Sequence, residues 1–163
     1  MYCSKCGNVL EKKFLEHEGM INFCKCCNEY VFDRTNVAVS MIILNPDETK
    51  ILFIKQYGKD KFILVAGYTN PGESLEHTVY REMGEEIGRY PKSIEFNMSK
   101  YFAPSNTLIS NFICKLTSMD IFPNEEIDYY EWIPLEEANE KIAQARLARE
   151  FVKEFFNKRK KLN

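Results

Sequence analysis

The chain has 163 residues, of which 45% are hydrophobic and 28% charged, and its formal net charge at pH 7 is −2. This length suits one ordinary domain with a small appendage, and the near-neutral charge argues against general electrostatic binding to nucleic acid or anionic membranes. No apolar run approaches the roughly 20 residues that cross a bilayer, and the N-terminus is too polar for a signal peptide. We therefore expect a cytoplasmic protein without membrane association.

Five of the six cysteines lie within the first 27 residues. Cys3 and Cys6 form one CxxC pair, Cys24 and Cys27 form a second, and 17 residues separate them, as in structural zinc sites built from four thiolates. Cys26 offers a different register in place of Cys27, but Cys27 makes the two pairs symmetrical. Without a secretory signal, such pairs favour metal ligation over disulfides. The sequence therefore predicts a zinc ribbon over residues 1–34 that depends on structural Zn²⁺ for its folding energy.

A strand pattern follows the cysteine-rich segment and opens a second domain, residues 35–163. Apolar, β-branched runs predict strands at 37–44, 50–56 and 62–66. Turn residues at 45–47 lie between the first two runs, so we expect these two strands to form a hairpin.

A helix is predicted between Ser74, a favourable N-cap residue, and Gly88, a favourable C-terminal cap. Apolar residues recur at every fourth position and form its core stripe: Leu75, Val79, Met83 and Ile87. Gly84 is out of place in a helix interior, where glycine costs about 1 kcal/mol relative to alanine.

The same helix carries a dense group of carboxylates. Glu82, Glu85 and Glu86 lie at offsets of 0, 3 and 4, so they are expected to project from one face, off the core stripe and toward solvent or a cleft. Like charges at this spacing repel one another. A bound divalent cation would offset the repulsion, and ligands that are all oxygen favour Mg²⁺ or Mn²⁺ over Zn²⁺.

Further strands are expected at 93–102, 108–116 and 129–133. A helix is predicted to begin at Pro134, and an amphipathic helix is predicted over 145–161. Strands before and after a central helix, with helices at the end, indicate a mixed α+β fold.

The run from Gly67 to Gly88 resembles the Nudix box, G-x5-E-x7-R-E-U-x-E-E-x-G-U, in which U is aliphatic. Eight residues match at the required spacing: Gly67, Glu73, Arg81, Glu82, Met83, Glu85, Glu86 and Gly88. Arg89 departs from the pattern, because an aliphatic residue is expected there. The resemblance implies the Nudix fold, an α/β/α sandwich of the α+β class with a mixed sheet.

The resemblance also implies divalent-cation-dependent hydrolysis of the diphosphate bond in a nucleoside diphosphate linked to another group. Glu82 and Glu86 would be the principal metal ligands, with Glu85 beside them or acting through water, and the backbone carbonyl of Ala66 would join the metal shell. Bound cations would neutralise the diphosphate and lower the pKa of a bound water. Which glutamate is the general base stays open.

Other residues receive supporting roles from the resemblance. Arg81 would orient or neutralise a carboxylate, and Glu73 would tie the preceding loop to the helix. Outside the box, Glu126 matches a further acidic ligand, six residues before the tryptophan of a late strand, here Trp132. The alternative is that Glu126 is a solvated turn charge.

A zinc ribbon followed by a Nudix domain resembles the NADH pyrophosphatase branch of the family. That branch carries the signature SQPWPFPxSLM, followed by a glycine and a phenylalanine, and this chain aligns with it at Ser99, Leu108 and Phe112. Phe102 replaces the tryptophan, and the other positions differ. The resemblance makes NADH, NAD and ADP-ribose candidate substrates. Three residues become candidate base contacts, with ordinary strand and loop positions as the alternative: Tyr101, Phe102 and Asn106.

A function of a different class is a zinc-ribbon module that binds nucleic acid or protein and uses the Nudix fold for recognition. The intact carboxylate cluster argues against this function, and acidic residues offset the lysines of the ribbon. The sequence does not separate action on nucleotide-capped RNA from action on free dinucleotides. A homodimer is implied by the family resemblance alone.

Overall fold

The computed structural model describes residues 1–162 and divides into two compact units, one ending at Thr35 and the other beginning at Asn36. This division lies one residue from the predicted domain boundary. No helix in the described part of the chain is long and apolar enough to cross a membrane.

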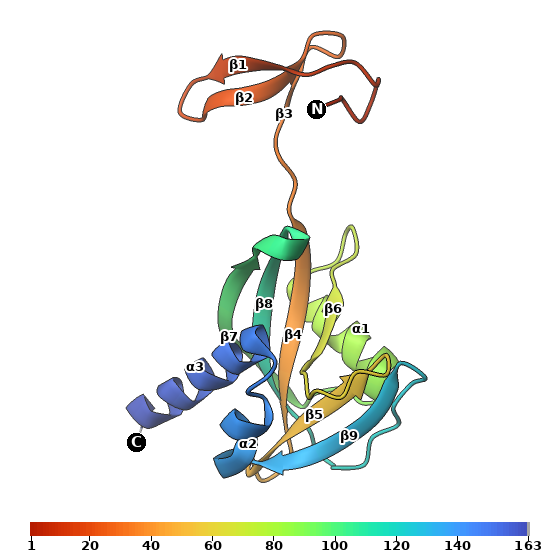
Figure 1. Cartoon of the computed structure of the whole chain (residues 1–163), viewed down its shortest axis with the longest axis vertical. Coiled ribbons are helices and arrows are strands. Elements are labelled where there is room, and N and C mark those ends of the chain that lie inside the picture. Colours follow the sequence, from red (N-terminus) through yellow and green to blue (C-terminus); the bar gives the residue numbers. More distant parts are fainter. Residues whose placement is uncertain (163) are drawn as a thin grey trace. The chain divides into compact units, whose positions relative to one another are not determined.

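The N-terminal unit is a three-stranded antiparallel sheet in the order β1-β2-β3 (Figure 1). Its strands are β1 (Glu11–Leu15), β2 (Gly19–Cys24) and β3 (Glu29–Val31). Within this unit the buried hydrophobic side chains are Cys3, Phe23 and Cys24. Burial on this scale supplies too little hydrophobic free energy to hold so small a unit together, so the unit needs another source of stability.

The second unit is a six-stranded mixed sheet with helices on both faces (Figure 1). The strand order is β7-β8-β4-β5-β9, with β6 paired to β4; β4 and β8 are parallel and the other pairs are antiparallel. Its elements are β4 (Asn36–Leu44), β5 (Lys50–Gln56), β6 (Val65–Tyr68), α1 (Leu75–Ile87), β7 (Ser93–Phe102), the 3-10 turn η1 (Ala103–Ser105), β8 (Thr107–Lys115), β9 (Ile127–Pro134), α2 (Leu135–Lys141) and α3 (Arg146–Leu162). The predicted α/β/α sandwich with a mixed sheet is confirmed.

Strand β4 is buried on both faces and separates two hydrophobic cores. Val39, Met41 and Ile43 pack in one cluster with α1, whereas Ile42 and Leu44 pack with α2 and α3 on the opposite face. This alternation follows from the two-residue period of a strand. The two cores hold α1 and α3 on opposite sides of the sheet.

Helix α1 begins and ends as its capping residues predict. Ser74 Oγ accepts a hydrogen bond from the backbone N–H of His77 at 3.1 Å, and Gly88 has the left-handed φ of 63° that a C-terminal cap requires. The structure also explains the glycine at position 84 inside the helix, because a larger residue would collide with a neighbouring side chain. A Cβ atom there would lie 2.9 Å from the ring of Tyr90.

Two predicted boundaries differ in detail from the structure. The strand predicted at 62–66 begins three residues later, at Val65, because Ile63 pairs with Ile54 of β5 in an isolated bridge, whereas Val65 and the residues after it pair with β4. Pro134 caps α2 and does not stand in its first turn.

Candidate active site

Strand β6 and helix α1 approach each other at Gly67. A Cβ atom on Gly67 would lie 1.8 Å from the carboxyl carbon of Glu82, so only glycine lets this carboxylate rest against the strand. The contact places Glu82 next to Ala66, the residue whose carbonyl was predicted to join a metal shell. It explains in physical terms why the motif begins with glycine.

Arg81 is the central cation of the site. Its Nε donates to Glu73 Oε1 at 2.7 Å, and its Nη1 donates to Glu82 Oε1 at 2.7 Å and to Glu85 Oε2 at 3.0 Å. Its Nη2 donates to the carbonyl of Tyr68 at 2.8 Å. Arg81 therefore joins three glutamates to strand β6 and fixes the orientation of Glu82.

Glu73 connects the loop before α1 to the helix itself. Its Oε2 accepts hydrogen bonds from the backbone N–H of Asn70 at 3.0 Å and from Thr78 Oγ1 at 3.1 Å. The Arg81 guanidinium, together with these donors, holds the pKa of Glu73 at about 2. Through these contacts, Glu73 links the loop before α1 to the helix.

Glu82 and Glu86 are buried, and only 5% of the surface of Glu86 is exposed. Glu86 Oε2 accepts a hydrogen bond from Gln56 Nε2 at 2.9 Å, and no ion pair to Glu86 occurs in the described part of the chain. Burial, with the negative charges of Glu82 and Glu126, raises the pKa of Glu86 to about 8; burial also raises the pKa of Glu82. Buried carboxylates that outnumber their cationic partners fit a divalent cation held by oxygen ligands.

The three glutamates of α1 project from one side of the helix, as their spacing predicts, but they differ in burial. Glu85 is largely exposed, with 58% of its side chain accessible, whereas Glu82 and Glu86 are buried and do not face solvent. At 100° per residue, Glu85 is turned about 60° from Glu82 and about 100° from Glu86, which leaves it over the helix edge. The carboxylate face of α1 therefore consists of a buried pair, Glu82 and Glu86, with the exposed Glu85 beside it.

Glu126 lies on the segment that leads into β9, where Tyr57 donates its hydroxyl to Glu126 Oε2 at 2.7 Å. The backbone N–H of Gly58 donates to Asp128 at 2.7 Å, and a hollow of about 520 Å³ lies over these residues. The charge of Glu126 contributes to the raised pKa of Glu86, so the two carboxylates belong to one electrostatic neighbourhood.

Two further residues of the site, Gln56 and Tyr57, are not predicted from the sequence. The ladder between β5 and β9 shifts register between Lys55 and Gln56, and Tyr57 has a positive φ of 56°. This bulge and turn direct two adjacent side chains to Glu86 and to Glu126. The tyrosine-glycine pair at 57–58 is a weak turn signal, and it does not reveal the targets of the side chains.

The thiols of Cys3, Cys6, Cys24 and Cys27 lie within 4.8 Å of one another, whereas Cys26 is exposed and outside the group. The structure thus brings Cys27 to the cluster in place of Cys26. The backbone N–H of Asn8, together with the neighbouring thiols, lowers the pKa of Cys6 to about 6. Four gathered thiols with a readily ionised member fit a closed tetrahedral zinc site.

The carboxylates are not drawn together as tightly as the thiols. Among the described residues, the four thiols are the group close enough to hold a metal, whereas the buried glutamates are turned toward neighbouring donors. Arg81 and Gln56 provide these donors, because carboxylates of like charge separate and pair with whatever donors are near.

An apolar pocket of about 430 Å³ lies between the sheet and the N-terminal end of α3, next to Ala66. Phe102, one of the three candidate base contacts, lines this pocket. Tyr101 and Asn106 do not line it, because the Tyr101 hydroxyl donates to Asn106 Oδ1 at 2.9 Å at the end of the β7–β8 hairpin. The structure therefore brings one of the three predicted base contacts to a cavity.

Arg89, which departs from the box pattern, forms specific contacts beyond the helix end. Its Nε donates to the carbonyl of Asp120 at 2.6 Å, and its guanidinium lies 4.8 Å from the ring centre of Phe122. Trp132 packs against the core on the α1 side, and its Nε1 donates to the carbonyl of Met119 at 3.1 Å. These contacts anchor the segment that leads to Glu126.

The model of the NUDIX domain matches residues 34–155 of the chain. The NAD-capped RNA hydrolase NudC of Pseudomonas aeruginosa is 25% identical over 152 residues, covering 93% of this chain and 54% of that protein. The chain therefore spans about half the length of this relative.

Two solved structures show a similar fold. A NUDIX hydrolase from Nitrosomonas europaea superposes with a TM-score of 0.66 at 24% identity and covers 93% of this chain and 88% of its own. The NUDIX domain of Shewanella oneidensis NrtR, complexed with ADP ribose, superposes with a TM-score of 0.57 at 19% identity and covers 71% and 88% of the two chains.

Proposed function

Because the chain belongs to the NUDIX domain family, we propose that it hydrolyses, with bound Mg²⁺ or Mn²⁺, the diphosphate bond of a nucleoside diphosphate linked to a second group. The observation that carries this proposal is the buried pair Glu82 and Glu86, one helical turn apart, with more negative charge than the described cations offset. A protein that only binds a macromolecule has no need of such a pair.

The chain's own residues prepare this site for a cation. Arg81 orients Glu82, Gln56 orients Glu86, and Tyr57 orients Glu126, which we propose as a further ligand from outside the box. When bound, the divalent cation would offset the charge of the diphosphate and lower the pKa of a coordinated water. One glutamate of the set accepts the proton of the attacking water, and pH–rate profiles of single glutamine variants would identify it.

We propose a dinucleotide such as NADH, NAD or ADP-ribose as substrate. The apolar pocket beside Ala66 has a volume suited to a nucleoside, and Phe102 offers an aromatic face to a base. The name of the Pseudomonas relative adds support, because an NAD cap contains a diphosphate that links two nucleosides. The name of this relative also makes nucleotide-capped RNA the second candidate substrate.

We propose that Cys3, Cys6, Cys24 and Cys27 hold one structural Zn²⁺. The small buried core of the N-terminal unit supports this role, since metal binding would supply the missing folding energy. Homodimer formation stays a prediction that sedimentation equilibrium would test.

A product-resolved screen tests the proposed reaction. The protein is incubated with NADH, NAD, ADP-ribose and an NAD-capped RNA, each with Mg²⁺ or Mn²⁺, and the nucleotide products are separated. We expect cleavage to mononucleotide products by the wild type and none by Glu86→Gln. Absence of diphosphate cleavage in every substrate, or wild-type turnover by the variant, would refute the proposal.

A further inference from the structure

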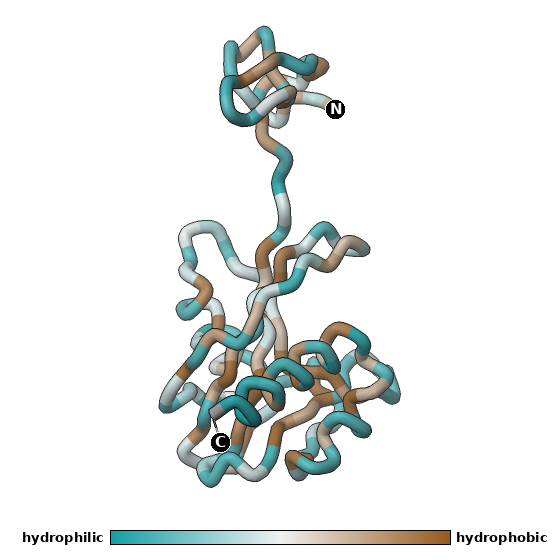
Figure 2. Tube along the Cα trace, turned by 90° about the vertical axis from the view of Figure 1, so that its left-hand side faces the viewer, coloured by the Kyte–Doolittle hydropathy of each residue, from teal (hydrophilic) through white to brown (hydrophobic). Residues whose placement is uncertain are grey.

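The solvent face of α3 carries a line of positive charges, which we call the basic stripe: Arg146, Arg149, Lys153 and Lys160. At 100° per residue these four positions fall within about 60° of one another around the helix, and all four residues are exposed. The opposite face of α3 is buried in the core through Phe151, Val152 and Phe155. In Figure 2 the turns of α3 beside the C-terminus are teal, the colour of hydrophilic residues.

The fold uses little of the charge of the basic stripe. Arg149, Lys153 and Lys160 form no ion pair within the described residues, and Arg146 lies 4.0 Å from Glu150 at the edge of an ion-pair distance. Like charges three or four residues apart repel one another by a few tenths of a kcal/mol each. Within the chain, Arg149 and Lys153 therefore repel each other without a compensating ion pair, whereas Lys160 gains from the dipole at the C-terminal end of the helix.

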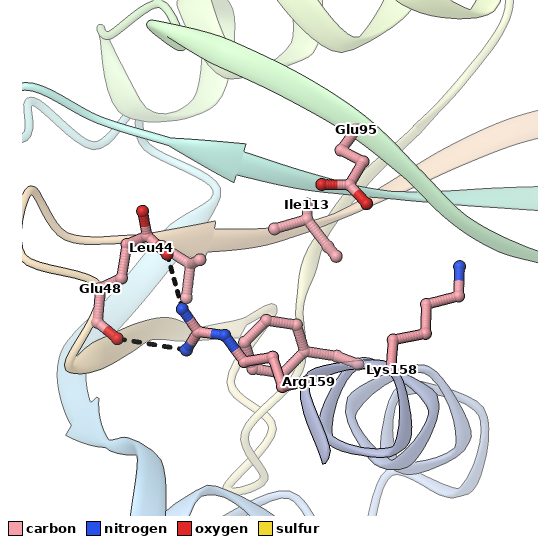
Figure 3. Close-up of a pocket in the computed structure, with 7 residues that line it drawn as sticks. Leu44, Glu48, Glu95, Ile113, Lys158 and Arg159 are labelled. Carbon is pink, nitrogen blue, oxygen red and sulfur yellow. Dashed lines mark hydrogen bonds and ion pairs between the residues drawn. The ribbon is translucent and has the colours of Figure 1, made fainter. Parts of the chain in front are cut away.

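Two other cations of α3, Lys158 and Arg159, differ from the basic stripe because they bond to other parts of the fold. Arg159 Nη2 donates to Glu48 Oε2 at 2.5 Å, and Lys158 Nζ donates to the carbonyl of Asn97. Figure 3 shows Arg159 turned to Glu48 at the edge of a hollow of about 490 Å³. These two side chains hold the helix to the sheet, so they are not part of the stripe.

The basic stripe begins at the proposed substrate pocket. Arg146 lines the apolar pocket that also contains Ala66 and Phe102. From there the stripe follows the helix to Lys160, a length of about 21 Å at 1.5 Å per residue. A polyanion that starts in the pocket would meet successive positive charges as it leaves.

We infer that the basic stripe binds the phosphates of single-stranded RNA whose 5′-terminal nucleoside occupies the pocket. This inference rests on the proposed function and specifies its substrate as a nucleotide-capped RNA. Repeated phosphates complement a line of exposed cations, three of which form no ion pair within the described residues, and such contacts supply affinity without base specificity. A membrane surface fits less well, because the apolar face of α3 is packed in the core and cannot enter a bilayer.

The test neutralises two lysines of the stripe with Lys153→Gln/Lys160→Gln, since glutamine has nearly the helix propensity of lysine. The matched control is Lys12→Gln/Lys92→Gln, which removes two exposed lysines outside α3. The substrates are free NAD and a ten-nucleotide RNA with an NAD cap. We expect kcat/KM for the capped RNA to fall about tenfold at low salt. The slope of log(kcat/KM) against log[salt] should become less negative by about 1.4, because two phosphate contacts are lost. For free NAD, and for the control with either substrate, we expect changes within about twofold.

Several results would overturn the inference. Equal losses on both substrates would place the lysines in the reaction site, and an unchanged salt dependence with capped RNA would remove them from RNA binding. If the wild type cleaves neither substrate, the proposed function fails, but fluorescence anisotropy with a 5′-phosphorylated RNA still tests the stripe. In that case the inference about the basic stripe would be refuted by equal RNA affinity of wild type and variant. It would also be refuted if the lysines supported binding to phosphatidylserine vesicles but the protein did not bind RNA.

Discussion

Glu86 is the residue whose surroundings conflict most with its charge. Its pKa is about 8 in the folded protein, against an ordinary value of 4.5. Between these values the folded chain keeps a proton that the unfolded chain has released. The free energy of unfolding therefore falls as the pH rises from about 4.5 to about 8, and this contribution is constant above that range.

Glu86→Gln removes this titration and preserves the shape of the side chain. Without added Mg²⁺ or Mn²⁺, we expect the variant to melt at a higher temperature than the wild type at pH 8, and the advantage to shrink toward pH 5. The difference at pH 8 should be on the order of a few kcal/mol. Thermal unfolding followed by circular dichroism at both pH values measures it, with Glu85→Gln as an exposed control. A variant less stable than the wild type at pH 8 would contradict the assigned burial effect.

Tyr57 adopts an unfavourable backbone conformation, and its hydroxyl donates to Glu126. We expect Tyr57→Phe to weaken Mn²⁺ binding about tenfold, as loss of a partner to a metal ligand commonly does. Isothermal titration calorimetry measures the affinity without any turnover. Tyr30→Phe is the matched control, because the Tyr30 hydroxyl donates to the backbone of Phe14 in the N-terminal unit. Equal affinities of the two variants would show that Tyr57 does not position a ligand.

At the scale of elements, the contact between β6 and α1 shapes the site. The helix lies so close to the strand that the Glu82 carboxylate occupies the space of a Cβ atom on Gly67. An alanine there forces the carboxylate away from the strand, although Gly67 has no side chain that could bind a metal. The function of this glycine is therefore the position of Glu82.

Gly67→Ala should lower the rate of diphosphate hydrolysis by about 100-fold, because it displaces a proposed metal ligand. If Gly67→Ala acts by displacing Glu82, the two substitutions should not be additive. Once Glu82→Ala has removed the carboxylate, adding Gly67→Ala should lower the hydrolysis rate almost no further. Single-turnover rates of the two single variants and the double variant measure the coupling. Additive losses would mean that Gly67 acts through the loop and not through Glu82.

Elements set by local patterns were predicted well, and those set by distant contacts were not. The caps of α1 and the extent of β5 and β7 follow from capping chemistry and apolar runs, which a short window contains. The turn at Gln56 and Tyr57 depends on a register shift against β9, about 70 residues later in the chain. For the same reason, helical periodicity alone did not show which glutamates are buried.

At the scale of the whole molecule, the chain combines two units with different sources of stability. The second unit has a hydrophobic cluster on each face of its sheet, whereas the N-terminal unit buries few apolar side chains. Cysteine spacing predicted the four thiols because a zinc knuckle is a local pattern. The apolar pocket was not predictable as a cavity, because it joins residues of β4, β6 and α3 that are far apart in the sequence.

If zinc supplies the folding energy of the N-terminal unit, metal removal should act on that unit alone. We expect purified protein to contain about one zinc per chain, and Cys27→Ser but not Cys26→Ser to lose it. After a thiol-compatible chelator removes the zinc, scanning calorimetry should show the ribbon transition lost and the main transition at an unchanged temperature. Free-dinucleotide hydrolysis should return in full when Mg²⁺ or Mn²⁺ is added back without zinc. Simultaneous loss of both transitions would mean that the two units fold as one, and that the four thiols stabilise the whole chain.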